Sequence, residues 1–273
     1  MSERTLAAAP SRRWALPPLA RLRGMALRWT SPLVLLALWE IIGRLGLVRP
    51  FLLPPLESVV ARLGEDIADG ALLNNAAITL YHALAGFVLS VAIGVPLGLL
   101  IARRRAFRWF CEPVVSVGFP MPKIAFLPIF MLWFGVFDLS KIVMVTFSTV
   151  FTVIAAADAG ARGVETRLVW SAQSLGARSL AVFWEVALPA SMPQILTGLQ
   201  VALPQSMIIA VGAEMLMGGA GLGGAMMQAG SYADAVGVYA GIVETAAVGM
   251  IAVVLMARLR AWLLRWHAEF NPR

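Results

Sequence analysis

The sequence has few of the residues that build disulfides, metal sites and polar surfaces. It contains one cysteine, Cys111, and two histidines, His82 and His267. A single cysteine excludes an internal disulfide framework, and two distant histidines offer no metal-ligand spacing. Charged residues make up only 14% of the chain, too few for the surface of a soluble domain. The glycine-rich P-loop that cradles ATP phosphates is also absent, so we expect no enzymatic ATP hydrolysis by this chain itself.

Long apolar segments take the place of polar surface. Hydrophobic residues make up 60% of the chain, and its mean hydropathy is +0.81. Runs of this length and number predict an all-α polytopic membrane protein with one membrane domain, residues 31–266. Six transmembrane helices are expected, at about residues 32–48, 81–102, 107–136, 142–157, 193–217 and 236–257. A short amphipathic helix is expected over residues 56–67, outside the membrane.

Proline and glycine inside two of the runs predict how the helices bend and pack. A straight helix over residues 107–136 would be about 45 Å long, against a hydrocarbon core of about 30 Å. Pro120 and Pro122 lack the amide hydrogen that a helix needs, which predicts a break with Lys123 beside it. In the second run, glycines such as Gly86 and Gly94 predict close packing against other helices.

The basic residues are unevenly distributed between the two sides of the predicted membrane domain. Of 22 Lys and Arg residues, 17 lie in the tail 1–30, in residues 103–108, in the loop 159–192 or at the C-terminus, and four lie on the other side. The positive-inside rule places the first side, with both tails (1–30 and 267–273), in the cytoplasm of a bacterial inner membrane. Topology thus explains the net charge of +7, and no basic face with interleaved aromatics indicates nucleic acid.

The loop at residues 159–192 is amphipathic. Apolar residues recur at helical spacing in two stretches, which predicts two short helices. Gly176 is expected in the left-handed C-cap of the first helix, and Ser179 is expected to cap the second. Pro189 and Pro193 are expected to bound a turn back into the membrane. The two apolar faces either pack under the protein's own helices or dock onto a partner.

The same loop resembles the EAA signature of ABC importer permeases, in which a Glu-Ala-Ala run precedes a glycine and a downstream Leu-Pro. Four positions match it: Ala172, Gly176, Leu188 and Pro189. Trp170 and Ser171 stand where the family usually has Glu and Ala. LLALWEIIGRLGLVRPFLLPP, PMPKIAFLPIFMLWFG and AEMLMGGAGLG are similar to permeases of nitrate, sulfonate and taurine importers. Together the resemblance covers roughly residues 33–266.

The resemblance implies a type I ABC importer fold with two permease copies as a homodimer, two cytoplasmic ATPases that bind the ATP, and a periplasmic or lipid-anchored substrate-binding protein. Alternating access would then import a small, anionic solute such as nitrate, a sulfonate or taurine, and this chain would need no cofactor of its own. The loop would supply the helix that couples to the ATPase, by shape and apolar burial more than by charge. The implied coupling residues are Trp170, Ser171, Ala172, Leu175, Gly176, Ala177, Leu180, Phe183, Leu188 and Pro189.

Polar side chains inside the predicted spans are candidates for the translocation path or its gate. They are Lys123, Gln200, Gln205, Ser206 and Glu214. Lys123 either attracts an anion or extends to the membrane interface. The glutamines and the serine either bond neighbouring helices or line an aqueous cavity. Glu214 either lines the path or braces helices, and the glycine-rich segment after it is either a re-entrant turn or a plain loop.

Two further intramembrane carboxylates allow a different class of transporter. Glu40 is expected to pair with Arg44, one helical turn away, and Glu244 is expected to brace helices. If Glu40, Glu214 and Glu244 instead relayed protons or bound an ion, the protein would be a secondary transporter driven by a gradient. That alternative leaves the amphipathic loop unexplained, and no inverted pair of interrupted helices supports it. A purely structural membrane scaffold is a third possibility.

Overall fold

A computed structural model describes residues 18–46, 48–178 and 181–266 of the chain. These residues are largely helical, and none of them forms a strand, which confirms the all-α prediction. The chain divides into two compact units, Met1–Leu56 and Glu57–Arg273.

The first unit is built on α1 (Pro18–Arg44). Near the end of this helix, Trp39 Nε1 donates a hydrogen bond to the carbonyl oxygen of Pro54, at 2.9 Å. Glu40 pairs with Arg44, as predicted, and its second oxygen accepts from the backbone amide of Leu56 at 3.2 Å. Most of the predicted span 32–48 lies in α1, which begins within the predicted tail; residues 1–17 of that tail lie outside the described residues.

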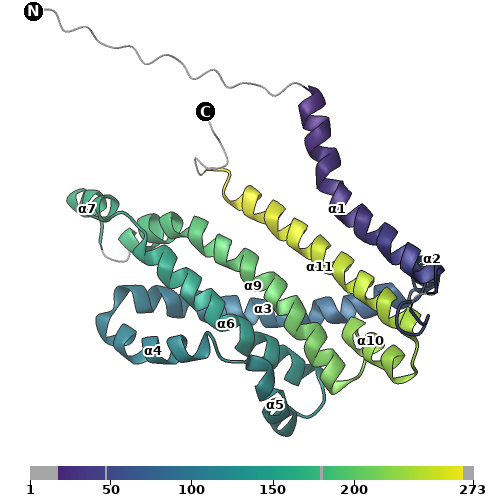
Figure 1. The fold of residues 1–273 in the computed structure, drawn as a ribbon. Coiled ribbons are helices and arrows are strands. Elements are labelled where there is room, and N and C mark those ends of the chain that lie inside the picture. The colour runs from purple at the N-terminus through teal and green to yellow at the C-terminus, as the bar shows by residue number, and fades with distance from the viewer. Residues whose placement is uncertain (1–17, 47, 179–180, 267–273) are drawn as a thin grey trace, which may run out of the picture. The chain divides into compact units, whose positions relative to one another are not determined.

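The second unit contains all the other described helices (Figure 1). They are α2 (Leu56–Ala68), α3 (Ala71–Arg103), α4 (Arg105–Gly118), η1 (Lys123–Phe126), α5 (Leu127–Phe134), α6 (Asp138–Arg162), α7 (Thr166–Ser174), η2 (Val182–Ala187), α9 (Leu188–Met217), α10 (Leu222–Ser231) and α11 (Ala235–Leu263). Four segments are long and apolar enough to cross a membrane, namely α3, α6, η2 with α9, and α11, and α4 with α5 forms a bent fifth candidate. The expected count of six spans is therefore not confirmed.

Glycines on α3 allow α6 to approach its backbone closely. A β-carbon at Gly86 would lie 2.5 Å from the side chain of Val145, and one at Gly94 would lie 2.8 Å from that of Val153. Real β-carbons do not approach other atoms so closely, so larger residues at these positions would push the two helices apart. The predicted close packing of the second run is confirmed.

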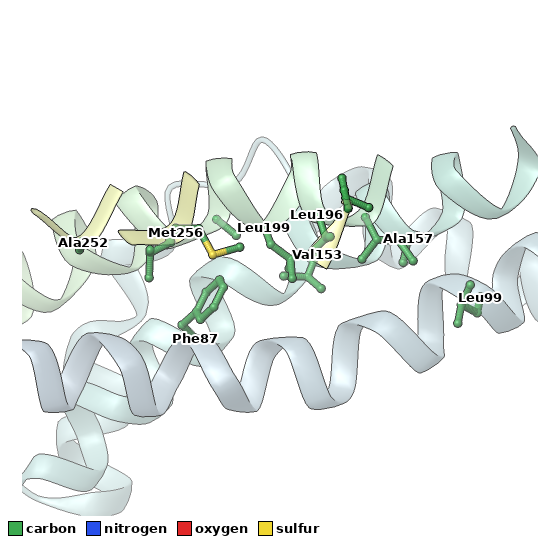
Figure 2. Packing of buried hydrophobic residues seen from close by; sticks show 12 residues of the cluster. Phe87, Leu99, Val153, Ala157, Leu196, Leu199, Ala252 and Met256 are labelled. Atoms are coloured by element: carbon green, nitrogen blue, oxygen red, sulfur yellow. The ribbon is translucent and has the colours of Figure 1, made fainter. Parts of the chain in front are cut away.

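The main apolar core lies between α3, α6, α9 and α11. Figure 2 shows Phe87 of α3 pointing toward Leu199 of α9 and Met256 of α11. Along the same interface Val153 of α6 lies beside Leu196, and both are buried. Lipid tails are as apolar as these side chains, so close packing, more than removal from water, holds the helices together within a membrane.

The third predicted span is broken where its prolines lie. α4 ends at Gly118, the α5 segment resumes with η1 at Lys123, and the two parts are bent by 95°. Lys123 begins η1, as predicted, and its ammonium group donates to the carbonyl oxygen of Phe119. The same nitrogen lies 5.6 Å from the ring centroid of Phe119 and 5.9 Å from that of Phe151. Lys123 is therefore held at the bend by a carbonyl group and two aromatic rings.

Candidate functional site

The short helix α7 ends in a Schellman motif at Gly176. Its backbone φ is +85°, the amide of Gly176 donates to the carbonyl of Gln173 at 2.9 Å, and the amide of Ala177 donates to that of Ala172 at 3.1 Å. These two bonds satisfy carbonyls that a helix end leaves unpaired. Glycine adopts this left-handed conformation without steric cost, so the sequence ends the helix where the C-cap was predicted.

Apolar side chains of α7 and its C-terminal turn face outward. Leu175 is 89% exposed and Trp170 is 63% exposed. Of the other predicted coupling residues here, Ser171 is exposed, whereas Ala172 and Ala177 are half-buried. Leu180 lies outside the described residues. An exposed apolar tip of this kind is typical of a surface that binds another protein, and α7 projects at one end of the helix bundle (Figure 1).

The chain enters α9 through a π-helix, which corrects the predicted turn between Pro189 and Pro193. In η2 the amide of Leu188 donates to the carbonyl of Phe183, five residues back, and α9 follows without a break. Pro189 has no amide to donate, and its ring crowds the carbonyl four residues earlier; the wider π-turn accommodates both defects. The second loop helix and the fifth span therefore form one continuous segment from Val182 to Met217 rather than a helix, a turn and a span.

Phe183 connects η2 to the end of α3. The guanidinium carbon of Arg103 lies 4.5 Å from the centroid of the Phe183 ring, and the Trp184 ring packs edge-on at 5.0 Å. Phe183 and Leu188 are half-buried against the main core, and Pro189 is half-buried as well. The predicted coupling residues thus form two groups: an exposed tip on α7 and an anchored segment that leads into α9.

Polar candidates in the middle of α9 bond to neighbouring parts of the same subunit. Gln205 accepts from the Thr152 hydroxyl at 2.7 Å and donates to the Ser148 carbonyl at 3.1 Å, both on α6. Ser206 is fully buried and donates to a carbonyl one turn earlier at 2.7 Å. Gln200 is half-buried on the same helix. Gln205 therefore links α9 to α6.

Glu214 is fully buried near the C-terminal end of α9, where it meets α3 and α10. Its Oε2 accepts from the Thr79 hydroxyl at 2.8 Å and from the Gly223 amide at 3.0 Å. Its Oε1 lies 2.8 Å from Nδ1 of His82. One carboxylate thus joins three helices.

The glycine-rich segment folds around this carboxylate and starts a helix that the sequence did not predict. Only residues 218–221 are non-helical, and α10 begins at Leu222. The amide of Leu222 donates to Thr79 Oγ1 at 2.9 Å, and the amide of Gly221 donates to Asn75 Oδ1 at 3.3 Å. Side chains of α3, together with Glu214, therefore cap the N-terminus of α10. A β-carbon at Gly221 would lie 2.5 Å from the Glu214 carboxylate, so glycine is needed there.

Charged groups of α6 extend the Glu214 cluster. His82 is fully buried, and its Nε2 lies 3.1 Å from Asp138 Oδ1 without hydrogen-bond geometry. Lys141, only 3% exposed, has its ammonium nitrogen 3.9 Å from the same oxygen. In the sequence, His82 is weighed only as a possible metal ligand. A histidine in one apolar run and a carboxylate in another are the signal that the sequence offers for this cluster.

The long apolar helices, with a short exposed helix between two of them, define a polytopic α-helical membrane protein. Residues 94–266 match the family described as "Binding-protein-dependent transport system inner membrane component", and the chain belongs to that family. Its function is that of a permease component of an ABC transport system and not that of an enzyme. The family assignment confirms the resemblance to ABC importer permeases and gives no support to a gradient-driven secondary transporter.

Two curated relatives and one solved structure illustrate the similarity. The chain is 30% identical over 266 residues to the taurine transport system permease protein TauC of Escherichia coli K12, covering 91% of this chain and 97% of that protein. It is 30% identical over 240 residues to the putative aliphatic sulfonates transport permease protein SsuC of Bacillus subtilis 168, covering 88% and 87%. The inward-facing MetNI methionine ABC transporter has a chain of the same fold, with a TM-score of 0.56 at 15% identity, covering 67% of this chain and 94% of that one.

Proposed function

We propose that this chain is the permease subunit of an ABC importer for small sulfonates, with taurine as a representative substrate. The taurine and aliphatic sulfonate permeases to which it is similar support this substrate class. ATP hydrolysis takes place on a separate cytoplasmic ATPase, and a periplasmic or lipid-anchored binding protein delivers the solute. The membrane domain at residues 31–266 lies in the bacterial inner membrane, with α7 and both termini in the cytoplasm.

Docking of α7 into a groove of the ATPase couples hydrolysis to transport. The observation that carries this step is the exposed apolar tip, in which Leu175 is 89% exposed and Trp170 is 63% exposed. The Schellman turn at Gly176 redirects the chain sharply, so that the tip protrudes from the loop. Because Trp170 occupies the position of an acidic family residue, the contact is apolar, and partner binding should depend only weakly on salt.

The translocation path lies between two copies of this chain in a homodimer. Support comes from the polar candidates, which have partners within one subunit: Gln205 on α6, Glu214 on α3 and α10, and Lys123 at the bend. Side chains that already make such hydrogen bonds cannot bind a passing solute unless those bonds break first. A two-fold interface provides a path without breaking them.

Reconstitution tests the proposal. The chain is purified with its ATPase, inserted into proteoliposomes and supplied with its binding protein, and uptake of labelled taurine and of ethanesulfonate is measured. We expect uptake of at least one of the two that requires ATP on the ATPase side. Uptake driven by an ion gradient alone, without the ATPase, would overturn the proposal.

A substitution pair tests the docking surface. Leu175→Ser removes an exposed leucine of the tip, and burial of a leucine contributes about 1.5–3 kcal/mol, so ATPase affinity should fall by about tenfold or more. Val60→Ser on α2 is the matched control, since Val60 is 58% exposed but lies outside α7. Equal ATPase co-purification by the two variants would count against docking through α7.

A further inference from the structure

The segment between α3 and α6 crosses the membrane. Gly86 of α3 lies against Val145 of α6, and Gly94 lies against Val153. The residue numbers increase together along the two helices, so α3 and α6 run in the same direction. Both helices are long and apolar enough to be spans. The chain that joins the end of α3 to the start of α6 therefore has to return across the bilayer, and α4 with η1 and α5 is a broken span rather than a re-entrant loop.

The break in this span lies well inside the membrane. A β-carbon at Gly118, where α4 ends, would lie 2.3 Å from the ring of Phe151. Phe151 is about 16–20 Å from either end of α6 (Asp138–Arg162) at 1.5 Å per residue. The hydrocarbon core is about 30 Å thick, so the level of Phe151 is close to its middle. Residues 119–122 therefore form non-helical backbone at membrane depth.

One copy of the chain leaves this backbone uncovered. Pro120 and Pro122 have no amide hydrogen and are both exposed. The carbonyls of Ser116 and Gly118 therefore lose the donors that a continuous helix would supply four residues later. Phe119, at the start of the break, is 51% exposed. Lipid tails donate no hydrogen bonds, and irregular backbone at this depth occurs only where protein covers it or water reaches it. The break therefore does not face lipid.

A charge at the same depth supports this conclusion independently. Lys123 begins η1 directly after the break, and its ammonium group donates to the carbonyl oxygen of Phe119. Its other close neighbours are the rings of Phe119 and Phe151, and no carboxylate of the described residues forms an ion pair with it. Charged side chains inside a membrane almost always face the interior of a helix bundle or a water-filled cavity. Lys123, like the break, thus requires protein or water on its exposed side.

α4 continues the uncovered surface away from the break. Phe110, Val114 and Val117 recur at helical spacing and are 77%, 60% and 68% exposed. α4 packs on α3 and α6, and Figure 1 shows α4 and α5 on the side of the second unit away from α11. These three side chains with residues 119–124 form one surface, which we call the α4 face. In the proposed importer the ATPase and the binding protein lie outside the bilayer, so another permease copy is the protein available to cover it.

We infer that the α4 face is covered by a second copy of this chain and forms the subunit interface. The inference rests on the proposed homodimer and names the surface through which it assembles. A two-fold axis places the same face of both copies together. The break and Lys123 of each copy then lie between the two subunits, where the translocation path is proposed, and neither meets lipid.

Spin labels test whether the α4 face meets lipid. Cys111 is replaced by serine, and a nitroxide is attached to a cysteine placed at Val117 or Ile124 in the permease–ATPase complex in nanodiscs. Met250, 68% exposed near the middle of α11, is the control position. Molecular oxygen concentrates among lipid tails, so we expect high oxygen accessibility at Met250 and low accessibility at the other two positions. Oxygen accessibility at Val117 or Ile124 equal to that at Met250 would overturn the inference.

The distance between the two copies locates the second subunit. One nitroxide per copy gives one inter-copy distance in a pulsed dipolar experiment on the same complex. We expect the two labels at Val117 to be closer together than the two labels at Met250, because only the α4 face lies at the interface. An equal or longer distance at Val117 would contradict the interface even where its oxygen accessibility is low.

A substitution pair tests the contact without a label. Val117→Trp adds bulk at an exposed position, so the isolated copy should fold as before, but the ring overpacks a subunit interface. The dissociation constant of the permease dimer should increase about tenfold. Met250→Trp, with the same added ring on α11, should leave that constant unchanged. Equal dissociation constants in the two variants, with circular dichroism matching the parent protein, would refute the assignment.

None of these measurements depends on transport, which separates this inference from the proposed function. If the parent protein takes up neither taurine nor ethanesulfonate, the substrate proposal fails, and the spin labels still decide whether two copies meet at the α4 face. If ATP-driven uptake is present while the labels at Val117 and Ile124 face lipid, the importer function stands and the interface assignment fails.

Discussion

Substitution of Glu214 tests whether this carboxylate braces the helices around it. Glu214→Ala removes the acceptor of the Thr79 hydroxyl, at 2.8 Å, and of the Gly223 amide, at 3.0 Å, in a fully buried place. Each buried donor left unpaired costs about 1–3 kcal/mol. The two orphaned donors therefore predict a decrease of about 2–6 kcal/mol in the free energy of unfolding, before any cost of the cavity is added.

Glu214→Gln is the matched control, because its amide oxygen can accept both hydrogen bonds. The amide nitrogen would then face His82 Nδ1, which lies 2.8 Å from the carboxylate oxygen it replaces. A neutral His82 can accept there if its proton is on Nε2, the nitrogen that lies 3.1 Å from Asp138. Because the Thr79 hydroxyl and the Gly223 amide keep an acceptor, the expected loss is below about 1.5 kcal/mol.

The assay is unfolding of the purified protein by SDS in mixed micelles, followed by circular dichroism, with uptake measured in parallel. Stability should decrease in the order parent, Glu214→Gln, Glu214→Ala, with the larger step at the second change. If the alanine variant unfolds like the parent while both variants lose uptake, the bracing role is refuted. Glu214 would then belong to the transport path.

Three further substitutions probe α7, the α3–α6 contact and η2. Gly176→Val forces a β-branched residue into a left-handed conformation that costs an ordinary L-residue about 1–2 kcal/mol, so ATPase co-purification should fall, whereas Gly176→Asn should retain it. Gly86→Ala places a β-carbon 2.5 Å from α6 and should lower the free energy of unfolding by about 1–3 kcal/mol. The control is Gly64→Ala, which should not destabilise the protein because there is open space around Gly64. Phe183→Leu removes the aromatic ring under Arg103. We expect lower ATP-driven uptake with unchanged ATPase binding in a pull-down. Unchanged uptake would contradict a role of the Arg103–Phe183 contact in coupling.

Features that depend on nearby residues were predictable from the sequence. The break before Lys123 follows from two prolines, the end of α7 follows from Gly176, and the pair of Glu40 with Arg44 follows from their spacing on one helix. Each signal lies within a few residues of the structure it causes. The length of the apolar runs likewise indicated the long helices of the second unit.

Features that depend on distant residues were not predictable in this way. α10 was missed because its N-terminal amides are satisfied by Asn75 and Thr79, more than 140 positions away in the sequence. A glycine-rich segment has low helix propensity when considered alone, and only the tertiary caps offset it. The expected turn at Pro189 was wrong for a related reason: propensity rules for α-helices do not include the π-turn that accommodates a proline.

The contacts at the two ends of α9 differ in strength. This difference bears on how a movement caused by docking at α7 is transmitted to the membrane helices of the proposed importer. At the α7 end the segment is tied to α3 by the Arg103–Phe183 contact, an interaction of about 0.5–2 kcal/mol. At the other end Glu214 accepts buried hydrogen bonds from α3 and α10. The 30-residue helix between them resists changes in its length. A displacement of η2 therefore moves α9 as a whole and carries α10 along with it.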